Sequence, residues 1–305
     1  MATLLDFRRR IRSVKNTQQI TRAMKFVAAA RLRRAQEAAL AARPYAIELA
    51  RVLRSTMARI ESPEHPLLAK RPENNILVIV LTGERGLAGA FNSNVLRKAQ
   101  EFFRSHQGKK ITTIPVGKKG RDSLRRAGFT FAAEYVNVLA RVDFRTAREI
   151  ANLVADLYVK EEIDSVYIIF SEFKSVMVPT LAVEKLLPVE AIREDDTETD
   201  KRAERDRGNT KPGREPSETP IDYIYEQPEE QILAKLLPRY VETQILRAML
   251  ESSAAEHAAR MTAMEAATNN ANDVIEALTL HMNKVRQAAI TKEIIEIVSG
   301  ASYGA

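Results

Sequence analysis

Three glycines, Gly83, Gly86 and Gly89, lie between the apolar run Ile76–Thr82 and a stretch with helical character. Glycine turns at this position can cradle a phosphate at a helix N-terminus. The spacing differs from the dinucleotide fingerprint, which needs glycines two and then three residues apart, and the chain has no GxxxxGK[ST] motif. A tight strand-to-helix turn is the favoured interpretation, and phosphate binding stays open as the alternative.

Two clusters of charged residues could bind a ligand or take part in catalysis. The basic turn Gly117–Arg121 could touch a phosphate, although a solvated loop is favoured. Glu293 and Glu296 lie one helical turn apart, and paired carboxylates can perform acid–base work. No nucleophile, metal ligand or pocket accompanies them, so a contact surface is the better interpretation.

The composition excludes several classes of site. The chain has no Cys, which rules out disulfides, thiol redox control and cysteine-ligated zinc. Its four His residues have no partners at metal-ligand spacing, and no run of eighteen apolar residues could span a membrane. We therefore expect no metal, no cofactor and no catalytic site in this chain.

Apolar runs that alternate with helical patterns fill the middle of the chain and predict an α/β domain over residues 74–189. Strands are expected near 76–82, 111–116, 129–138 and 165–170, with a further strand within 176–187. Helices are expected near 94–105 and 143–161, with a short one before residue 129. The alternation favours a largely parallel, Rossmann-like sheet.

The two ends of the chain share a 3,4 spacing of apolar residues, which is the seam of a coiled coil. It runs from Leu4 to Leu53 and returns from His257 to Ala289, and residues 1–82 and 214–299 contain no glycine. We predict a helix over 1–62, capped by Thr3 with Asp6 and kinked or split at Pro44. A second helix is predicted within residues 228–305, starting near Pro228, with a local kink at Pro238, and stopping at Gly300.

Polar residues interrupt this seam. Gln18, Thr21 and Lys25 occupy consecutive seam positions on the first helix, as do His257 and Thr268 on the second. Such residues either fix the register of two helices at a cost in stability or mark a place where the helices splay apart. The sequence leaves both alternatives open.

Charge is distributed unevenly. Residues 1–60 hold fourteen Lys and Arg against three acidic residues, whereas residues 229–305 hold ten acidic and seven basic residues. The basic helix could bind nucleic acid or acidic protein partners, but aromatic residues are not interleaved with its cations. Residues 190–220 are highly charged and poor in apolar side chains, which predicts a flexible insertion.

The terminal helices carry longer motifs, and through them the chain closely resembles the γ subunits of F-type ATP synthases over almost its whole length. The resemblance rests on six stretches: Ile11–Ala28, Leu32–Ala35, Gly86–Asn92, Glu256–Met264, Ala267–Ala271 and Ile290–Ala301. It implies two long helices forming an antiparallel coiled coil, plus a central Rossmann-like α/β domain. The nearest alternative is a nucleic-acid-binding coiled-coil protein, and a third is a nucleotide-dependent enzyme.

The resemblance also implies a function. The chain would be the central rotor stalk, with the α and β subunits, the ε subunit and the membrane c-ring as partners and with the active sites on β. It would couple proton transport to ATP synthesis, regulate ATPase activity, and lie peripherally on the cytoplasmic side of a bacterial inner membrane. Residues 190–220 lie near the place where plastid relatives carry a regulatory thiol pair, which a chain without Cys cannot use.

Individual roles follow by position. The resemblance links seven residues to coupling or to contact with the catalytic subunits: Met24, Lys25, Arg260, Gln287, Thr291, Glu293 and Glu296. If the helices begin at similar depth, roughly fifteen residues of the second would overhang the first, ~20–25 Å of single helix. Five apolar residues lie in that overhang, and we expect them to form an apolar tip: Ile290, Ile294, Ile295, Ile297 and Val298.

Overall fold

The computed structural model describes residues 3–60, 65–173, 179–189 and 227–303. Its contacts divide the chain into two compact units. One contains residues 1–31, 87–89 and 257–305, and the other contains residues 32–86 and 90–256. Both long helices contribute to both units, so each half of a helix belongs to a different packing environment. The charged segment 190–220 lies outside the described residues, and its flexibility stays a prediction.

The two terminal helices are α1 (Leu4–Arg59) and α6 (Glu229–Tyr303). The predicted capping box at the start of α1 is present, because the Asp6 amide donates to Thr3 Oγ1 at 3.3 Å and the Thr3 amide donates to Asp6 Oδ2 at 3.0 Å. Pro44 lies inside α1, which is one continuous helix. The predicted end of α6 at Gly300 is wrong, since the helix continues through this residue to Tyr303.

The second unit is built on a five-stranded sheet of order β3-β2-β1-β4-β5. Its strands are β1 (Asn75–Leu81), β2 (Lys110–Val116), β3 (Thr130–Phe131), β4 (Ser165–Phe173) and β5 (Pro179–Leu187). The first four strands in this order are parallel, and β5 is antiparallel to β4. The connecting elements are η1 (Pro66–Leu68), α2 (Phe91–Ser105), α3 (Lys118–Arg126) and α4 (Phe144–Val159).

The third strand is much shorter than predicted. The sequence indicated a strand within 129–138, but β3 ends at Phe131 and only Tyr135 forms a further bridge, to Val116. The residues between them are Ala132, Ala133 and Glu134, which have low strand propensity. Glu134 instead forms an ion pair with Arg125 of α3, with Arg125 Nη2 2.5 Å from Glu134 Oε2.

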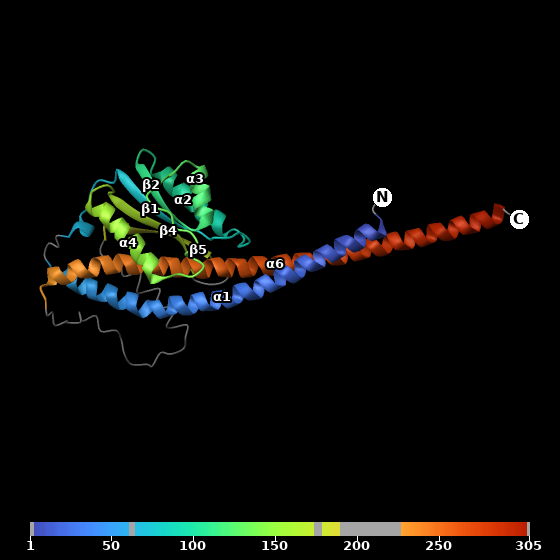
Figure 1. The fold of residues 1–305 in the computed structure, drawn as a ribbon, viewed down its shortest axis with the longest axis horizontal. Coiled ribbons are helices and arrows are strands. Elements are labelled where there is room, and N and C mark those ends of the chain that lie inside the picture. Colours follow the sequence, from blue (N-terminus) through green and yellow to red (C-terminus); the bar gives the residue numbers. More distant parts are fainter. Residues whose placement is uncertain (1–2, 61–64, 174–178, 190–226, 304–305) are drawn as a thin grey trace. The chain divides into compact units, whose positions relative to one another are not determined.

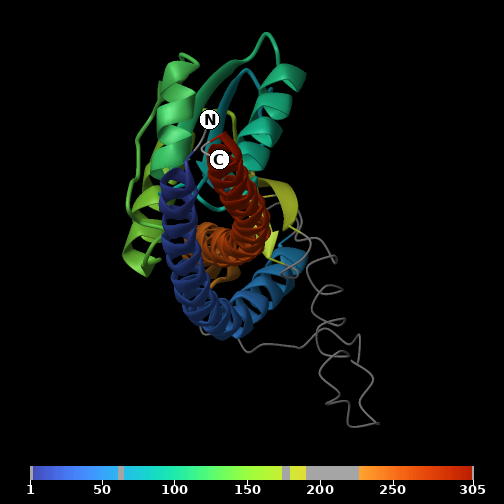
Figure 2. The same cartoon turned by 90° about the vertical axis from the view of Figure 1, so that its right-hand side faces the viewer.

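The sheet has an apolar layer on each face, as expected for parallel strands. Leu77, Ile79 and Leu81 of β1 pack in a core with α4, the second half of α1 and the first half of α6. The alternate residues Ile76 and Val78 pack in a second core with α2 and α3. Figure 1 shows α4 and the α2–α3 pair in these layers, which can also be followed in Figure 2.

Candidate functional site

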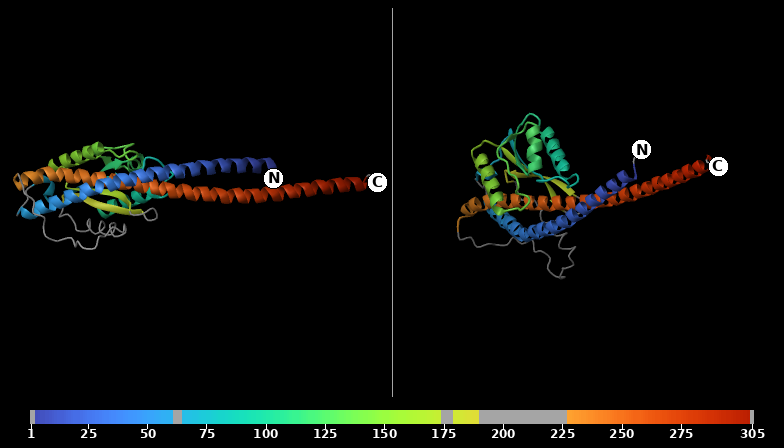
Figure 3. Two further views of the ribbon diagram at one scale, coloured as in Figure 1. Left: turned by 90° about the horizontal axis from the view of Figure 1, so that it is seen from below. Right: turned by 45° about the vertical axis from the view of Figure 1, so that its right-hand side comes forward.

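Within the first unit, α1 and α6 form an antiparallel pair. The rings of Phe7 and His281 lie 5.0 Å apart between centroids, and further along Gln18 Nε2 donates to Asn272 Oδ1. The numbers rise along α1 as they fall along α6, which defines the direction of pairing. Figure 3 shows the two helices side by side in this region. The seam predicted from the 3,4 spacing is therefore formed from Phe7 to Lys25 of α1 and from His281 to Glu265 of α6, whereas the predicted seam positions Met282, Val285 and Ala289 lie beyond these contacts.

The polar part of the seam is closed rather than splayed. Thr21 is 9% exposed, and its hydroxyl oxygen lies 2.8 Å from that of Thr268 across the pair. Ala28 and Met264 are buried nearby. Each hydroxyl can also donate to a carbonyl of its own helix, Thr21 to Gln18 at 3.0 Å and Thr268 to Met264 at 2.7 Å. A slip of the helices would remove only the contact between the two hydroxyls, and that contact favours the interpretation that polar residues fix the register.

Lys25 also finds its partner on the opposite helix. Its Nζ lies 2.5 Å from Glu265 Oε1, and the adjacent Met24 is half-buried. Sequence reasoning missed Glu265. The antiparallel register that joins Thr21 to Thr268 places Glu265 opposite Lys25, and this register is not visible in the sequence alone.

His257 lies at the start of the α6 segment in this unit and is buried. Arg260 Nη1 lies 3.4 Å from its Nδ1, one turn further along the helix. Burial, together with the positive charges of Arg260 and Arg31, lowers the pKa of His257 to about 4. His257 is therefore neutral at physiological pH, and Arg260 carries the charge at this position.

The other coupling residues predicted on α6 are separated along its length. Thr291 Oγ1 donates to the carbonyl of Gln287 at 3.0 Å, and Glu293 is exposed. The side chain of Glu296 lies outside the described residues. At ~1.5 Å per residue, Arg260 and Glu293 are about 50 Å apart along the helix, so these residues form a line of contacts and not one pocket.

The predicted overhang is present in the first unit. Since Phe7 near the start of α1 faces His281, roughly 20 residues of α6, ~30 Å of helix, continue beyond the pair. This overhang is longer than predicted, in part because α6 runs past Gly300 to Tyr303. Its apolar residues are exposed, from 48% at Ile290 to 70% at Ile297, with Ile294, Ile295 and Val298 between these values. Figure 3 shows the C-terminal end of α6 beyond the N-terminus of α1.

The glycine turn after β1 does not present an empty phosphate cradle. The Gly83 amide donates to Asn92 Oδ1 at 2.8 Å. A Cβ atom at Gly83 would lie 2.8 Å from the carboxyl carbon of Glu256, which is buried on α6. A carboxylate against this turn repels an anion, so the geometry favours the strand-to-helix interpretation over phosphate binding.

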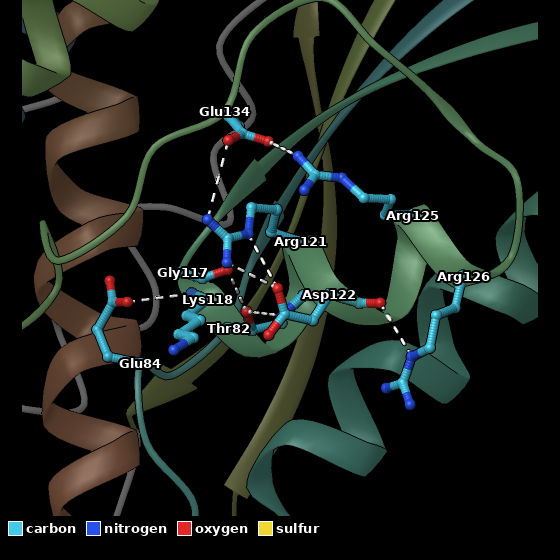
Figure 4. Close-up of polar contacts among 10 residues, drawn as sticks. Thr82, Glu84, Gly117, Lys118, Arg121, Asp122, Arg125, Arg126 and Glu134 are labelled. Atoms are coloured by element: carbon cyan, nitrogen blue, oxygen red, sulfur yellow. Dashed lines mark hydrogen bonds and ion pairs between the residues drawn. The ribbon is translucent and has the colours of Figure 1, made fainter.

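The basic turn after β2 is also occupied by the chain's own groups (Figure 4). The Lys118 amide donates to Glu84 Oε2 at 3.0 Å, and the Gly120 amide donates to Thr82 Oγ1 at 2.7 Å. Arg121 forms an ion pair with Asp122 at 2.8 Å. The amide donors at the start of α3 that could receive a phosphate are thus used internally, which favours a structural role for this turn.

The structure describes residues 3–60, 65–173, 179–189 and 227–303, and two findings apply to these residues. No group of three or more His, Asp or Glu side chains there is placed to bind a metal ion. No described helix is both long enough and apolar enough to cross a membrane.

Comparisons with known proteins agree with this arrangement. A family model described as ATP synthase matches residues 3–302. The ATP synthase gamma chain of Solibacter usitatus is 46% identical over 306 residues, covering 99% of each chain. That of Chloroherpeton thalassium is 44% identical over 310 residues, covering 99% of this chain and 98% of the relative.

Solved structures share the fold. A chain of the Euglena gracilis mitochondrial ATP synthase rotor matches with a TM-score of 0.62 at 20% identity, covering 94% of this chain and 98% of that one. A chain of the Tetrahymena thermophila central stalk and c-ring structure matches with a TM-score of 0.56 at 24% identity, covering 81% and 99%. With the full-length match to the curated relatives, these findings lead to one conclusion: the chain belongs to the ATP synthase gamma chain family.

Proposed function

We propose that this chain is the central stalk, or rotor, of an F-type ATP synthase, which transmits rotation between a membrane c-ring and a catalytic hexamer of α and β subunits. The observation that carries the proposal is its similarity to ATP synthase gamma chains over 99% of its length. Such a rotor couples proton translocation to ATP synthesis and regulates ATPase activity. The full-length similarity does not support the alternative of a nucleic-acid-binding coiled-coil protein.

In this proposal the chain is not itself an enzyme, and the active sites belong to the β subunits. A stalk favours one β conformation over another by contacting them differently as it turns, so it acts on a conformational equilibrium. The helix pair is suited to this role because its two sides differ: α1 is strongly basic and α6 is weakly acidic. Acidic surfaces on the catalytic subunits would be the natural partners of α1.

The coupling residues would contact the α and β subunits from both helices of the pair. Met24 and Lys25 lie on the paired segment, where Lys25 is held by Glu265. Arg260, Gln287, Thr291, Glu293 and Glu296 follow along α6 and would meet the α and β subunits at successive heights. The ε subunit and the c-ring would bind the α/β body. Attachment through this complex would hold the chain peripherally on the cytoplasmic side of a bacterial inner membrane.

The exposed apolar tip supports a bearing function. Ile290, Ile294, Ile297 and Val298 offer an apolar surface without a partner among the described residues. In water such a surface is unfavourable, and an apolar sleeve at the top of the hexamer would cover it. Contacts of this kind have no directional hydrogen bonds, so the tip could turn within the sleeve without breaking them.

Reconstitution with the α, β and ε subunits of the same organism tests the proposal. The chain should co-purify with them in a defined complex, and a probe attached to its body should rotate during ATP hydrolysis. Changing Ile294 and Ile297 together to Asp should reduce torque or assembly. As a matched control, Val274 and Leu280, exposed at 46% and 64% on the same helix, are changed to Asp. Failure to co-purify would reject the rotor, whereas equal torque in both variants would reject only the bearing.

A further inference from the structure

A buried carboxyl group on α6 has no role in the contacts described so far. Glu251 is 8% exposed, belongs to the second unit and lies within the electrostatic reach of Glu172 of β4 and Glu184 of β5. Its Oε2 atom is buried and accepts no hydrogen bond from any residue that the structure describes. A carboxylate in this position would be costly, because burial removes its hydration and no donor replaces it.

The charges around Glu251 come from three elements besides α6. Arg247 lies one turn earlier on the same helix, Glu172 on β4, Glu184 on β5 and Arg43 on α1. Arg247 is already engaged, since its Nη2 lies 2.5 Å from Glu184 Oε2. The positive charge nearest in sequence to Glu251 is thus shared with a competing carboxylate. Two carboxylates and two guanidinium groups surround Glu251, and none of them donates a hydrogen bond to its buried oxygen.

Burial raises the pKa of Glu251 to about 7, and the carboxylates of Glu172 and Glu184 add to this effect against the opposing charges of Arg247 and Arg43. At mildly acidic pH the side chain carries its proton and fits the buried site. At alkaline pH it is ionised beside two other acids. The ionised form is accommodated better where water can reach it, which requires α6 and the strands to separate.

We propose that Glu251 forms a pH-sensitive latch: its protonated form allows α6 to stay packed against the β4–β5 pair, and its ionised form loosens that contact. The ion pair between Arg247 and Glu184 joins the same two elements and gives the latch a second attachment that does not depend on this proton. Loosening is therefore local, confined to α6 near residue 251 and the adjoining strands.

The size of the effect follows from the two proton affinities. A carboxyl with a pKa of 4.5 when open and about 7 when closed shifts the opening equilibrium roughly tenfold between pH 6 and pH 8. The raised value in the closed state means that protonation favours closure. The stabilisation is complete below about pH 4.5, decreases as the pH rises and reaches its lower limit above about pH 7.

Hydrogen exchange of the full-length chain tests the latch. Protection factors of β5 amides and of the α6 amides around residue 251 are measured at pH 6 and pH 8, after correction for the intrinsic pH dependence of exchange. We expect roughly tenfold lower protection at pH 8 in the wild-type chain and no such change in Glu251→Gln. Glu242→Gln is the matched control, since Glu242 is also buried on α6 but is paired with Arg148 at 2.9 Å.

Three results would overturn the latch: equal wild-type protection at both pH values, a tenfold change that persists in Glu251→Gln, or loss of the change in Glu242→Gln. A second variant keeps the test decisive if Gln is not tolerated at position 251. Glu184→Gln removes a neighbouring carboxylate and frees Arg247, so the midpoint of the change should move to lower pH. An unmoved midpoint would overturn the proposal as well.

Discussion

Replacing Glu73 by Gln should destabilise the α/β body, because this side chain links three strands at the edge where the parallel strands begin. Its carboxylate accepts a hydrogen bond from Tyr167 of β4 at 2.9 Å. It also forms ion pairs with Lys185 of β5 at 3.0 Å and with Lys109, directly before β2, at 3.2 Å. An amide can replace at most part of this arrangement, since two of the partners are cations.

The size of the stability loss expected for Glu73→Gln can be estimated from the pKa of Glu73. Burial of Glu73 raises its pKa, but hydrogen bonds from Lys185, Tyr167 and Lys109 outweigh burial and lower the pKa from 4.5 to about 2. Each pKa unit corresponds to about 1.4 kcal/mol, which sets an upper limit of about 3 kcal/mol. The side chain is 23% exposed, so solvent screening reduces the expected loss to about 1–2 kcal/mol.

Denaturant unfolding of the full-length chain, followed by circular dichroism between pH 2 and pH 7, measures this loss. Because the folded pKa is lowered, the stabilisation is present above about pH 4.5 and disappears as the pH falls towards 2. Glu73→Gln should therefore differ from wild type at pH 7 and converge with it near pH 2. Glu101→Gln is the control, since Glu101 is exposed and forms a surface pair with Lys98 on α2 at 3.5 Å. A Glu73→Gln chain as stable as the Glu101→Gln chain at pH 7 would refute the reasoning.

Three further predictions concern other positions. Gly117→Ala should cost more than about 3 kcal/mol or prevent folding, because φ is 105° and the new Cβ would lie 1.9 Å from a backbone oxygen, whereas Gly86→Ala, with open space, should change thermal stability little. A double-mutant cycle on Lys25 and Glu265 should give a coupling of about 0.5 kcal/mol that shrinks in high salt, since both side chains are partly exposed. The wild-type chain should lose stability as the pH falls from 6.5 towards 4, because the pKa of His257 is lower in the folded chain than in the unfolded chain. His257→Gln should make this acid-induced loss smaller by about 1–3 kcal/mol.

Each of these predictions has a contrary outcome. Equal melting temperatures for the two glycine variants would show that the tight approach at Gly117 relaxes at little cost. A zero coupling in low salt would mean that the ion pair is not populated in solution. An acid transition that is the same with Gln at position 257 would assign that loss of stability to other groups.

Much of the fold could be predicted from the sequence because it depends on periodicity. The 3,4 spacing that begins at Leu4 and returns from His257 predicts two long helices, and the apolar run from Ile76 predicts a strand. The register of the helices could not be predicted, since many alignments of alanine-rich seams are nearly equal in apolar contact. It is decided by pairs such as Thr21 with Thr268, which become visible only in three dimensions.

The candidate chemistry was harder to judge from sequence. Gly83 looks the same in a phosphate cradle and in a turn closed by a carboxylate, and Glu256, which distinguishes the two, is far away in the chain. In the sequence Glu251 resembles any other helix residue, because two of the charged groups that act on it, Glu172 and Glu184, lie on strands more than sixty residues earlier. Charge and burial of this kind are properties of the packed structure. The roles of the seven coupling residues depend on partner subunits and stay predictions.

The order in which the core is assembled has a consequence for protein synthesis. One apolar face of the sheet is covered by Leu53 of α1, by α4 and by residues of α6 from Leu233 to Met249. The strands leave the ribosome before α6 exists, so part of this face stays exposed to water until the chain has been made as far as Met249. During that interval, nascent chains could associate through the uncovered sheet. Completion of α6 closes the surface, which makes C-terminal truncation before Met249 a route to aggregation and not merely to a shorter stalk.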